Sequence, residues 1–182
     1  PNIILLLSGK RKSGKDFISE QLTKRLGDKM QIVRISEPIK SEWAKKLNLD
    51  LKELLSDGPY KEKYRKDMIE WSDQVRSQDY GYFCREAAKT IDKDIVVVSD
   101  IRRKNDIKFF KESYSDIIKT IRIQASEEVR IGRGWKFQIG VDDVQSECDL
   151  DDYEDWDLVI QNDNNEDDAV IRILKYFNLE EL

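Results

Sequence analysis

Short apolar runs recur along the chain, and the longer segments between them space their apolar residues as helices do. The runs occupy Ile3–Leu7, Ile32–Ile35, Ile95–Val98, Ile117–Ile123 and Leu158–Ile160. Apolar runs that alternate with helical segments are typical of parallel strands buried on both faces. The pattern therefore predicts a three-layer α/β/α fold with a mostly parallel, five-stranded sheet.

The segments between the runs predict helices that each have one apolar face. We expect them at residues 14–26, from about Pro38 onward, and at 60–76, 105–114, 127–134 and 165–177. The apolar face of the first helix consists of Phe17, Ile18, Leu22 and Leu26, and that of the second consists of Trp43, Ala44 and Leu47. No repeat or Gly/Ser linker interrupts the chain, so we expect residues 1–182 to form one domain with a helical insertion at 37–91.

The composition excludes several classes of protein. The chain has no histidine, which removes the commonest general base and metal ligand and excludes hydrolase triads and zinc catalysis. The apolar runs are far shorter than the roughly 20 residues of a membrane span, so we expect no membrane partner. Cys84 and Cys148 lack a metal-binding spacing and are interpreted as reduced thiols, which makes the cytoplasm the expected location.

Acidic residues are concentrated near the end of the chain. Residues 142–168 contain 13 Asp or Glu and no Lys or Arg, so the rest of the chain is net basic although the whole carries a net charge of −5. The basic residues are dispersed and often lie beside acidic ones, which fits a pocket for a small anion better than a nucleic-acid surface. We therefore expect a small-molecule substrate, no nucleic acid, and a chain that acts as a monomer.

A phosphate-binding loop directly follows the first strand. Its residues Gly9-Lys10-Arg11-Lys12-Ser13-Gly14-Lys15 fit the pattern G-x-x-x-x-G-K, and Asp16 stands where Ser or Thr is usual. Successive N–H groups of such a loop, together with the following helix N-terminus, bind phosphate oxygens, and Lys15 reaches the β- and γ-phosphates. The alternative is an ordinary turn with solvated lysines. The strand before and the helix after, which the motif requires, favour phosphate binding.

The carboxylate of Asp16 would repel a nearby phosphate unless a cation lies between them. At about 4 Å and an effective dielectric constant of about 20, this repulsion is about 4 kcal/mol. One interpretation is that Asp16 holds Mg²⁺, directly or through water. The other is that Asp16 is simply an acidic residue in the first turn of a helix, where it is favourable.

The third apolar run ends in Ser99-Asp100-Ile101-Arg102-Arg103, at the sheet edge where α/β folds place their ligands. Asp100 either accepts a hydrogen bond near Mg²⁺ or caps the next helix. Arg102 and Arg103, if they lie in a turn, straddle a donor and an acceptor phosphate. The alternative for this pair is ordinary surface charge.

Two further segments carry basic residues that suit phosphate groups. The insertion contains Lys61, Arg65 and Arg76. Residues 126–142 contain Arg130 and Arg133 among glycines, which suits a lid that closes over phosphates, although a surface helix end is the alternative. The chain lacks the Asn-Lys-x-Asp sequence of a guanine-specific site. These groups indicate a kinase whose acceptor is itself anionic.

The motifs together resemble those of the animal-type phosphomevalonate kinases, a group of P-loop proteins similar to the nucleoside monophosphate kinases. The matching segments are residues 8–17, 60–62, 65–69, 83–85, 98–100, 102–103, 133–135, 140–143 and 146–148. The resemblance spans most of the chain and includes the Asp at the end of the phosphate loop. The ending Glu180-Glu181-Leu182 differs from the peroxisomal tripeptide S-K-L of some relatives, so the cytoplasm remains the expectation.

The resemblance implies transfer of the γ-phosphoryl group of ATP to (R)-5-phosphomevalonate, with Mg²⁺ as cofactor. It implies that residues 10–16 and Arg133 bind ATP, that Arg76, Arg102 and Arg103 bind the acceptor, and that Asn162 lies near it. From their positions in the motif, the insertion and the lid, we also expect Gly9 to belong to the ATP site and Lys61, Arg65 and Arg130 to bind the acceptor. Catalytic roles are expected for Lys15, Asp100, Arg102 and Arg103. The alternatives are another P-loop small-molecule or nucleoside monophosphate kinase, and a non-catalytic ATP-binding scaffold.

Overall fold

Among the described residues, five parallel strands form the central sheet. The computed structural model describes residues 1–48, 52 and 58–182. The strands are β1 (Ile3–Gly9), β2 (Met30–Val33), β3 (Ile95–Val98), β4 (Ile118–Gln124) and β5 (Leu158–Gln161). Their order in the sheet is β2-β3-β1-β4-β5, and each neighbouring pair is parallel. The α/β fold predicted from the apolar runs is confirmed.

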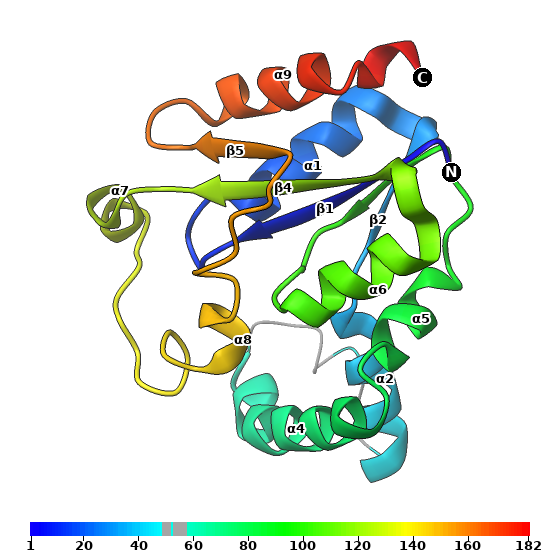
Figure 1. The fold of residues 1–182 in the computed structure, drawn as a ribbon. Helices are drawn as coiled ribbons and strands as arrows, with labels where there is room; N and C mark the ends of the chain where they lie inside the picture. Colours follow the sequence, from blue (N-terminus) through cyan, green and yellow to red (C-terminus); the bar gives the residue numbers. More distant parts are fainter. Residues whose placement is uncertain (49–51, 53–57) are drawn as a thin grey trace. The chain divides into compact units, whose positions relative to one another are not determined.

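Helices cover both faces of the sheet (Figure 1). Helices α1 (Lys15–Leu26) and α9 (Glu166–Tyr176) lie side by side on one face, and α6 (Lys104–Tyr114) lies on the other. Because both faces are covered, all four residues of β3 and the first six of β1 are buried. The short helices α7 (Glu127–Gly132) and α8 (Gln145–Cys148) follow β4 in the chain, and 3₁₀ turns occupy Gly27–Lys29, Ser115–Ile117 and Leu179–Glu181.

The chain forms two compact units, one comprising residues 1–33 and 91–182 and the other residues 34–90. The sheet belongs to the first unit, and the helices expected within residues 37–91 belong to the second. The expected helices are α2 (Ser36–Leu47) and α4 (Pro59–Gln78), and a further helix, α5 (Tyr82–Ala88), was not predicted from the sequence. Trp43 of α2 packs against Trp71 of α4 with ring centroids 5.4 Å apart, next to Tyr64 and Met68. Aromatic packing therefore joins α2 to α4.

The second strand lies two residues earlier than the apolar run 32–35 predicts. In the sheet, Met30 pairs with Ile95 and Val33 pairs with Val98, so the strand ends where its partner β3 ends. The chain then turns into α2 at Ser36. Ile35 is buried although it lies outside the strand. The apolar run therefore included two buried residues, Val33 and Ile35, but misplaced the strand boundaries.

Some helix positions also differ from the sequence-based expectation. Phe17 and Leu47 were placed on apolar faces, but they are 41% and 43% exposed. The buried face of α1 consists of Ile18, Ser19, Leu22 and Leu26. It therefore contains the small polar Ser19 in addition to three of the predicted aliphatic residues. The helix expected at 127–134 ends at Gly132. Gly134 has a φ angle of 93°, which a helix cannot accommodate.

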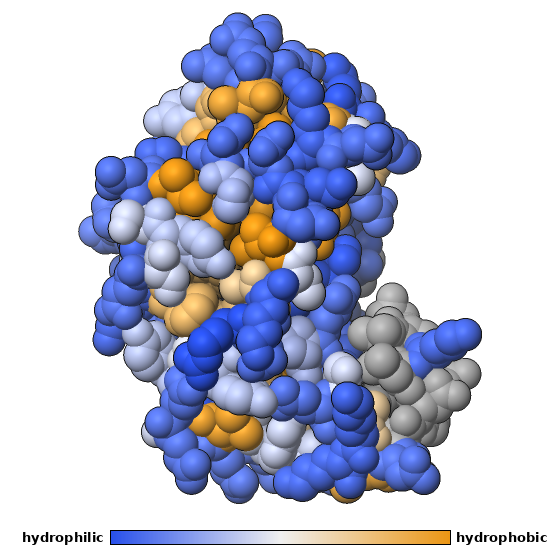
Figure 2. All heavy atoms as spheres, turned by 90° about the vertical axis from the view of Figure 1, so that its right-hand side faces the viewer, coloured by the Kyte–Doolittle hydropathy of each residue, from blue (hydrophilic) through white to orange (hydrophobic). Residues whose placement is uncertain are grey.

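Charged side chains cover much of the surface. Figure 2 shows a face on which hydrophilic residues predominate and apolar residues form small, separate areas. This agrees with a sequence in which 38% of residues are charged. Within the described ranges, no helix has both the length and the apolar character that crossing a membrane requires.

Candidate active site

The loop between β1 and α1 is tightly curved. Lys12 and Gly14 have φ angles of 67° and 94°, both in the left-handed region. The N–H of Ser13 donates a hydrogen bond of 3.0 Å to the carbonyl oxygen of Lys10. Helix α1 starts at Lys15, and the first N–H groups of a helix have no partner inside the helix. The loop and the helix start therefore form the kind of backbone cradle that binds phosphate.

The absence of a side chain at Gly9 lets the loop pack closely against its neighbours. A Cβ atom on Gly9 would lie 2.5 Å from Oγ of Ser13 and 2.9 Å from the backbone oxygen of Ile123. The hydroxyl of Ser13 is itself buried and has no hydrogen-bond partner among the described residues. A buried hydroxyl without a partner is costly, and a phosphate oxygen would satisfy it. The loop thus fits the phosphate tail of a nucleotide.

Lys15 lies among charged groups that come from several elements. Burial lowers the pKa of Lys15, and the positive charge of Arg102 lowers it further, whereas the carboxylates of Asp16, Asp100 and Glu147 oppose this change. The structure therefore brings the motif lysine together with Asp100 and Arg102 from the end of β3. A bound phosphate group would favour the charged form of Lys15.

The carboxylates near Lys15 suit a metal that is shared with phosphates. Among the described residues, no group of three or more Asp, Glu or Cys side chains is arranged to hold a metal ion by itself. Mg²⁺ commonly uses only one or two carboxylates together with phosphate oxygens and water. Asp16 is exposed in the first turn of α1, and Asp100 is partly exposed, so both fit this kind of site.

The turn that carries Arg102 and Arg103 is held by the buried side chain of Asp106. Its Oδ2 accepts hydrogen bonds of 3.2 and 3.0 Å from the N–H groups of Arg102 and Arg103. Asp106 therefore stabilises the start of α6. Capping of this helix was one of the two roles that the sequence suggested for Asp100. The guanidinium of Arg102 extends from this turn, and its Nη1 lies 3.8 Å from Oε2 of Glu147.

Both arginines of the expected lid contact the phosphate loop. Nε of Arg130 donates a 3.0 Å hydrogen bond to the carbonyl oxygen of Arg11, and its guanidinium lies 4.3 Å from the ring centroid of Trp135. Arg133 donates a 3.1 Å hydrogen bond from Nη1 to the carbonyl oxygen of Lys12. The structure thus places α7 and the residues after it beside the loop.

Asn162, which follows β5, is buried against the same loop. It is 2% exposed, and its Nδ2 donates a 2.9 Å hydrogen bond to the carbonyl oxygen of Ser13. The backbone carbonyl oxygen of Asn162 accepts a 2.8 Å hydrogen bond from Nη2 of Arg133. These contacts support a role for Asn162 in holding the loop and the lid arginine together.

Asp142 joins Arg11 to the segment after α7. Its carboxylate accepts hydrogen bonds from Nε and Nη2 of Arg11 at 3.2 and 2.8 Å, from Nε1 of Trp135 at 3.0 Å and from the N–H of Gln138 at 2.7 Å. Burial opposes ionisation of Asp142, but these hydrogen bonds outweigh it and lower its pKa to about 2. Asp142 is therefore an ionised anchor, and it was not among the residues expected from the sequence.

Arg122 is a second residue that the sequence analysis did not select. It lies inside β4, where Nη1 donates a 2.7 Å hydrogen bond to Oγ of Ser8 and Nη2 is 3.6 Å from Oδ1 of Asp151. Burial lowers the pKa of Arg122, and the charges of Asp151 and Glu147 oppose this change. An arginine between two isoleucines of an apolar strand is unusual. The sequence Ile121-Arg122-Ile123 was therefore the signal by which Arg122 could have been identified as a site residue.

A cavity of about 420 Å³ opens beside the loop. The side chains that give it its character are Lys10, Arg122, Arg130, Asp151, Tyr153 and Trp156. Three basic groups and two aromatic rings suit an organic anion.

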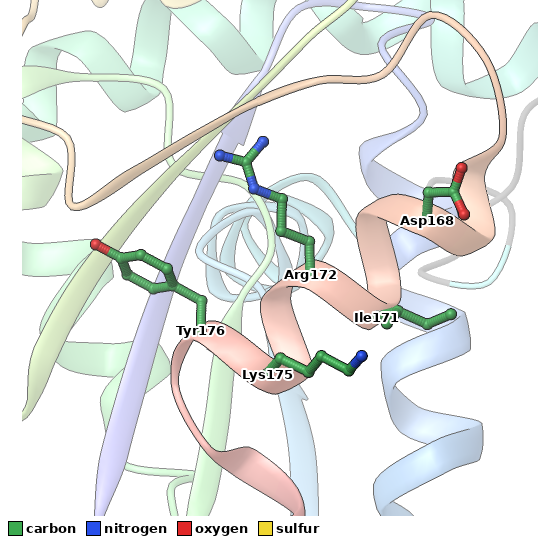
Figure 3. Close-up of a pocket in the computed structure, with 5 residues that line it drawn as sticks. All are labelled: Asp168, Ile171, Arg172, Lys175 and Tyr176. Atoms are coloured by element: carbon green, nitrogen blue, oxygen red, sulfur yellow. The ribbon is translucent and has the colours of Figure 1, made fainter.

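A second hollow of about 470 Å³ lies on the surface of α9, where Asp168, Arg172 and Tyr176 line it (Figure 3). It contains no residue of the phosphate loop and is separate from this site.

The basic residues of the insertion belong to the unit of residues 34–90. Arg65 and Arg76 lie on α4. Nη1 of Arg76 is 3.6 Å from Oδ1 of Asp73, and its guanidinium is 5.4 Å from the ring centroid of Phe83. The side chain of Lys61 lies outside the described part of the chain.

Comparisons with known proteins agree with this geometry. The structure is similar to that of TT1252 from Thermus thermophilus (TM-score 0.56, 15% identity, covering 98% of this chain and 97% of that one). It is equally similar to shikimate kinase from Acinetobacter baumannii in complex with shikimate (TM-score 0.56, 15% identity, covering 99% and 95%), which shows that the fold is that of a P-loop kinase.

The sequence model described as phosphomevalonate kinase matches residues 7–116. A phosphomevalonate kinase of Drosophila melanogaster is 59% identical over 94% of both chains. By this match and this identity, the chain belongs to the phosphomevalonate kinase family.

Proposed function

We propose that the protein transfers the γ-phosphoryl group of ATP to the phosphate of (R)-5-phosphomevalonate, which gives 5-diphosphomevalonate and ADP. The observation that carries the proposal is the phosphate loop, whose close packing leaves no room for a side chain at Gly9 and around which basic groups from β4, α7 and the end of β3 gather. Membership of the family supports the choice of acceptor.

The reaction needs charge neutralisation and positioning more than proton transfer. An oxygen of the acceptor phosphate forms the new bond to the γ-phosphorus, and the bond from that phosphorus to the β–γ bridging oxygen breaks, so that ADP leaves. A phosphate acceptor is already largely ionised at neutral pH, so no general base has to activate it. This agrees with a chain that contains no histidine.

The donor side of the site is built on the phosphate loop. We assign ATP binding to Gly9, Lys10, Arg11, Lys12, Ser13, Gly14, Lys15, Asp16 and Arg133. The N–H groups of Arg11 and Ser13 donate to Glu147 and Lys10, so we assign phosphate binding to the N–H groups at the start of α1. Lys15 stabilises the charge that develops on the transferred group, and Arg133 covers the loop. Mg²⁺, when bound, neutralises charge on the β- and γ-phosphate oxygens, and Asp16 fits the role of holding it, with Asp100 nearby.

The acceptor side relies on arginines. We assign acceptor binding to Lys61, Arg65, Arg76, Arg102, Arg103, Arg130 and Asn162. Arg102 and Arg103 leave the turn at the carboxyl end of β3, which is where parallel sheets place reacting groups. Guanidinium groups bind phosphates in a bidentate manner, so they reduce the repulsion between two anionic substrates and align them for transfer.

A test of the activity uses purified protein, Mg²⁺ and ATP with a panel of acceptors. The panel contains 5-phosphomevalonate, mevalonate, AMP, CMP and no acceptor. We expect ADP release and a diphosphate product only with 5-phosphomevalonate. Turnover of a nucleoside monophosphate instead would indicate another kinase, and ATP binding without acceptor-dependent ADP release would indicate a scaffold. Either result would overturn the proposal.

A further inference from the structure

Glu147 lies between the phosphate loop and Arg102. Its side chain, on the short helix α8, is only 10% exposed. One carboxylate oxygen, Oε1, accepts a 2.8 Å hydrogen bond from the N–H of Arg11 in the loop. The other, Oε2, lies 3.8 Å from Nη1 of Arg102. A single carboxylate therefore contacts both the donor-binding loop and an arginine of the acceptor side.

A nearly buried carboxylate is unexpected in a site that binds two phosphorylated anions. Its charge repels both substrates and is costly to remove from water. The carboxylate is retained among basic groups: the charge of Glu147 favours the ionised forms of Arg11, Lys15 and Arg122. Its effect is thus exerted on the cations that act on the substrates.

Arg102 needs a partner of this kind. Its side chain is 49% exposed, and a long, flexible arginine on a turn populates many rotamers unless an interaction selects one. An arginine that must stabilise a transferring phosphoryl group has to stay at a fixed distance from the donor phosphates. Glu147 can fix this distance because its Oε1 is bound to the loop while its Oε2 faces Arg102.

We propose that Glu147 is a positioning residue for phosphoryl transfer: it holds the guanidinium of Arg102 at a fixed distance from the phosphate loop. The proposal rests on the proposed kinase function and extends it to a residue outside those that we assign to ATP or the acceptor. The two oxygens have separate tasks. Oε1 holds the loop backbone at Arg11, beside the positive φ angle of Lys12, and Oε2 faces Arg102.

Other contacts hold the segment that carries Glu147 in place. Oδ2 of Asp149 accepts a 2.8 Å hydrogen bond from the N–H of Lys104, at the start of α6. Sγ of Cys148 donates a 3.2 Å hydrogen bond to the carbonyl oxygen of Asp142. We therefore expect α8 to keep its position when the charge of Glu147 is removed, so that the effect on catalysis can be separated from an effect on folding.

The experiment compares Glu147→Gln with the wild type in steady-state assays that vary ATP and 5-phosphomevalonate. Glutamine keeps the side-chain length and an oxygen acceptor for the N–H of Arg11, but it removes the charge that faces Arg102. We expect kcat to fall at least about tenfold, KM for ATP to change less than about threefold, and the thermal unfolding midpoint to stay the same. Glu147→Asp retains the charge and should keep more of the activity than Glu147→Gln.

A double-mutant cycle tests whether Glu147 acts through Arg102. In an Arg102→Ala background, Glu147→Gln should change kcat less than about twofold, because the group that it positions is absent. Glu154→Gln is the matched control, since it removes the same charge from an exposed residue a few positions later in the chain, and it should retain wild-type kcat.

Wild-type kcat in Glu147→Gln would overturn the inference, and so would full additivity with Arg102→Ala. An equal loss of kcat in Glu154→Gln would also overturn it, because the effect would then not depend on where the carboxylate lies. If the wild type itself shows no ADP release with 5-phosphomevalonate, the proposed function fails first and the inference fails with it. If the wild type is active and Glu147→Gln has the same kcat, the inference about Glu147 fails while the proposed function stands.

Discussion

Replacing Asp142 with Asn should reduce both the stability of the protein and the dependence of that stability on pH. The pKa of Asp142 is lowered from 3.8 to about 2, and its side chain is only 4% exposed, so solvent screens its interactions little. A difference of this size between the folded and unfolded states corresponds to about 2 kcal/mol of stability at neutral pH. Loss of the charge that interacts with Arg11, Trp135 and Gln138 therefore removes an appreciable part of a typical folding free energy.

The pH range of the effect follows from the direction of this change. Because the folded-state pKa lies below the unfolded-state value, the contribution is complete above about pH 5 and is lost as the pH falls through 3.8 toward 2. At about pH 3, roughly half of it remains. The difference in unfolding free energy between wild type and Asp142→Asn should therefore shrink by about 1 kcal/mol between about pH 6 and about pH 3.

Urea unfolding followed by circular dichroism at several pH values measures this difference. Asp143→Asn is the matched control, because it removes the same formal charge from an exposed neighbour, and it should cost less than about 0.5 kcal/mol at pH 7. Stability curves for wild type and Asp142→Asn that run parallel from pH 6 to pH 3 would refute the reasoning. They would mean that the carboxylate gains nothing from Arg11, Trp135 and Gln138.

Three further predictions concern the phosphate site. Gly9→Ala should weaken binding of an unreactive ATP analogue at least about tenfold by calorimetry, since its Cβ would meet Ser13 and the β4 backbone, whereas Gly132→Ala, which has open space around its Cβ, should bind normally. Asp16→Asn should raise the Mg²⁺ concentration needed for half-maximal rate, and an unchanged requirement with unchanged turnover would exclude a metal role. Arg102→Ala and Arg103→Ala should each lose about 2 to 4 kcal/mol of transition-state stabilisation in kcat/KM, and normal kinetics in both would remove them from the site.

The elements of the sheet could be predicted because their signal is local. The apolar runs gave β1 and β3 almost to the residue, since a strand buried on both faces has few polar positions. The shift of β2 by two residues could not be predicted, because its boundaries depend on pairing with β3. The exposure of Phe17 likewise depends on which neighbours α1 meets.

The candidate site was predictable only where a motif is continuous in the chain. Gly9, Gly14 and Lys15 were found because their spacing encodes one loop conformation. Glu147 and Asp142 were not selected, although a stretch of acidic residues was noticed. Both residues contact Arg11, which lies more than a hundred positions away in the chain, and no spacing rule reports such a partner.

Local chemistry in the sequence was enough to determine the alternation of strands and helices, the phosphate loop and the absence of histidine chemistry, because backbone preferences and side-chain types act over a few residues. Tertiary structure alone decided which charges meet. Lys10 pairs with Asp151 over a separation of 141 residues, and Arg11 meets Glu147 and Asp142 over 136 and 131. Such pairs form because the folded sheet brings the carboxyl ends of β1 and β4 and the segment before β5 to one place, and that proximity is a property of the whole fold.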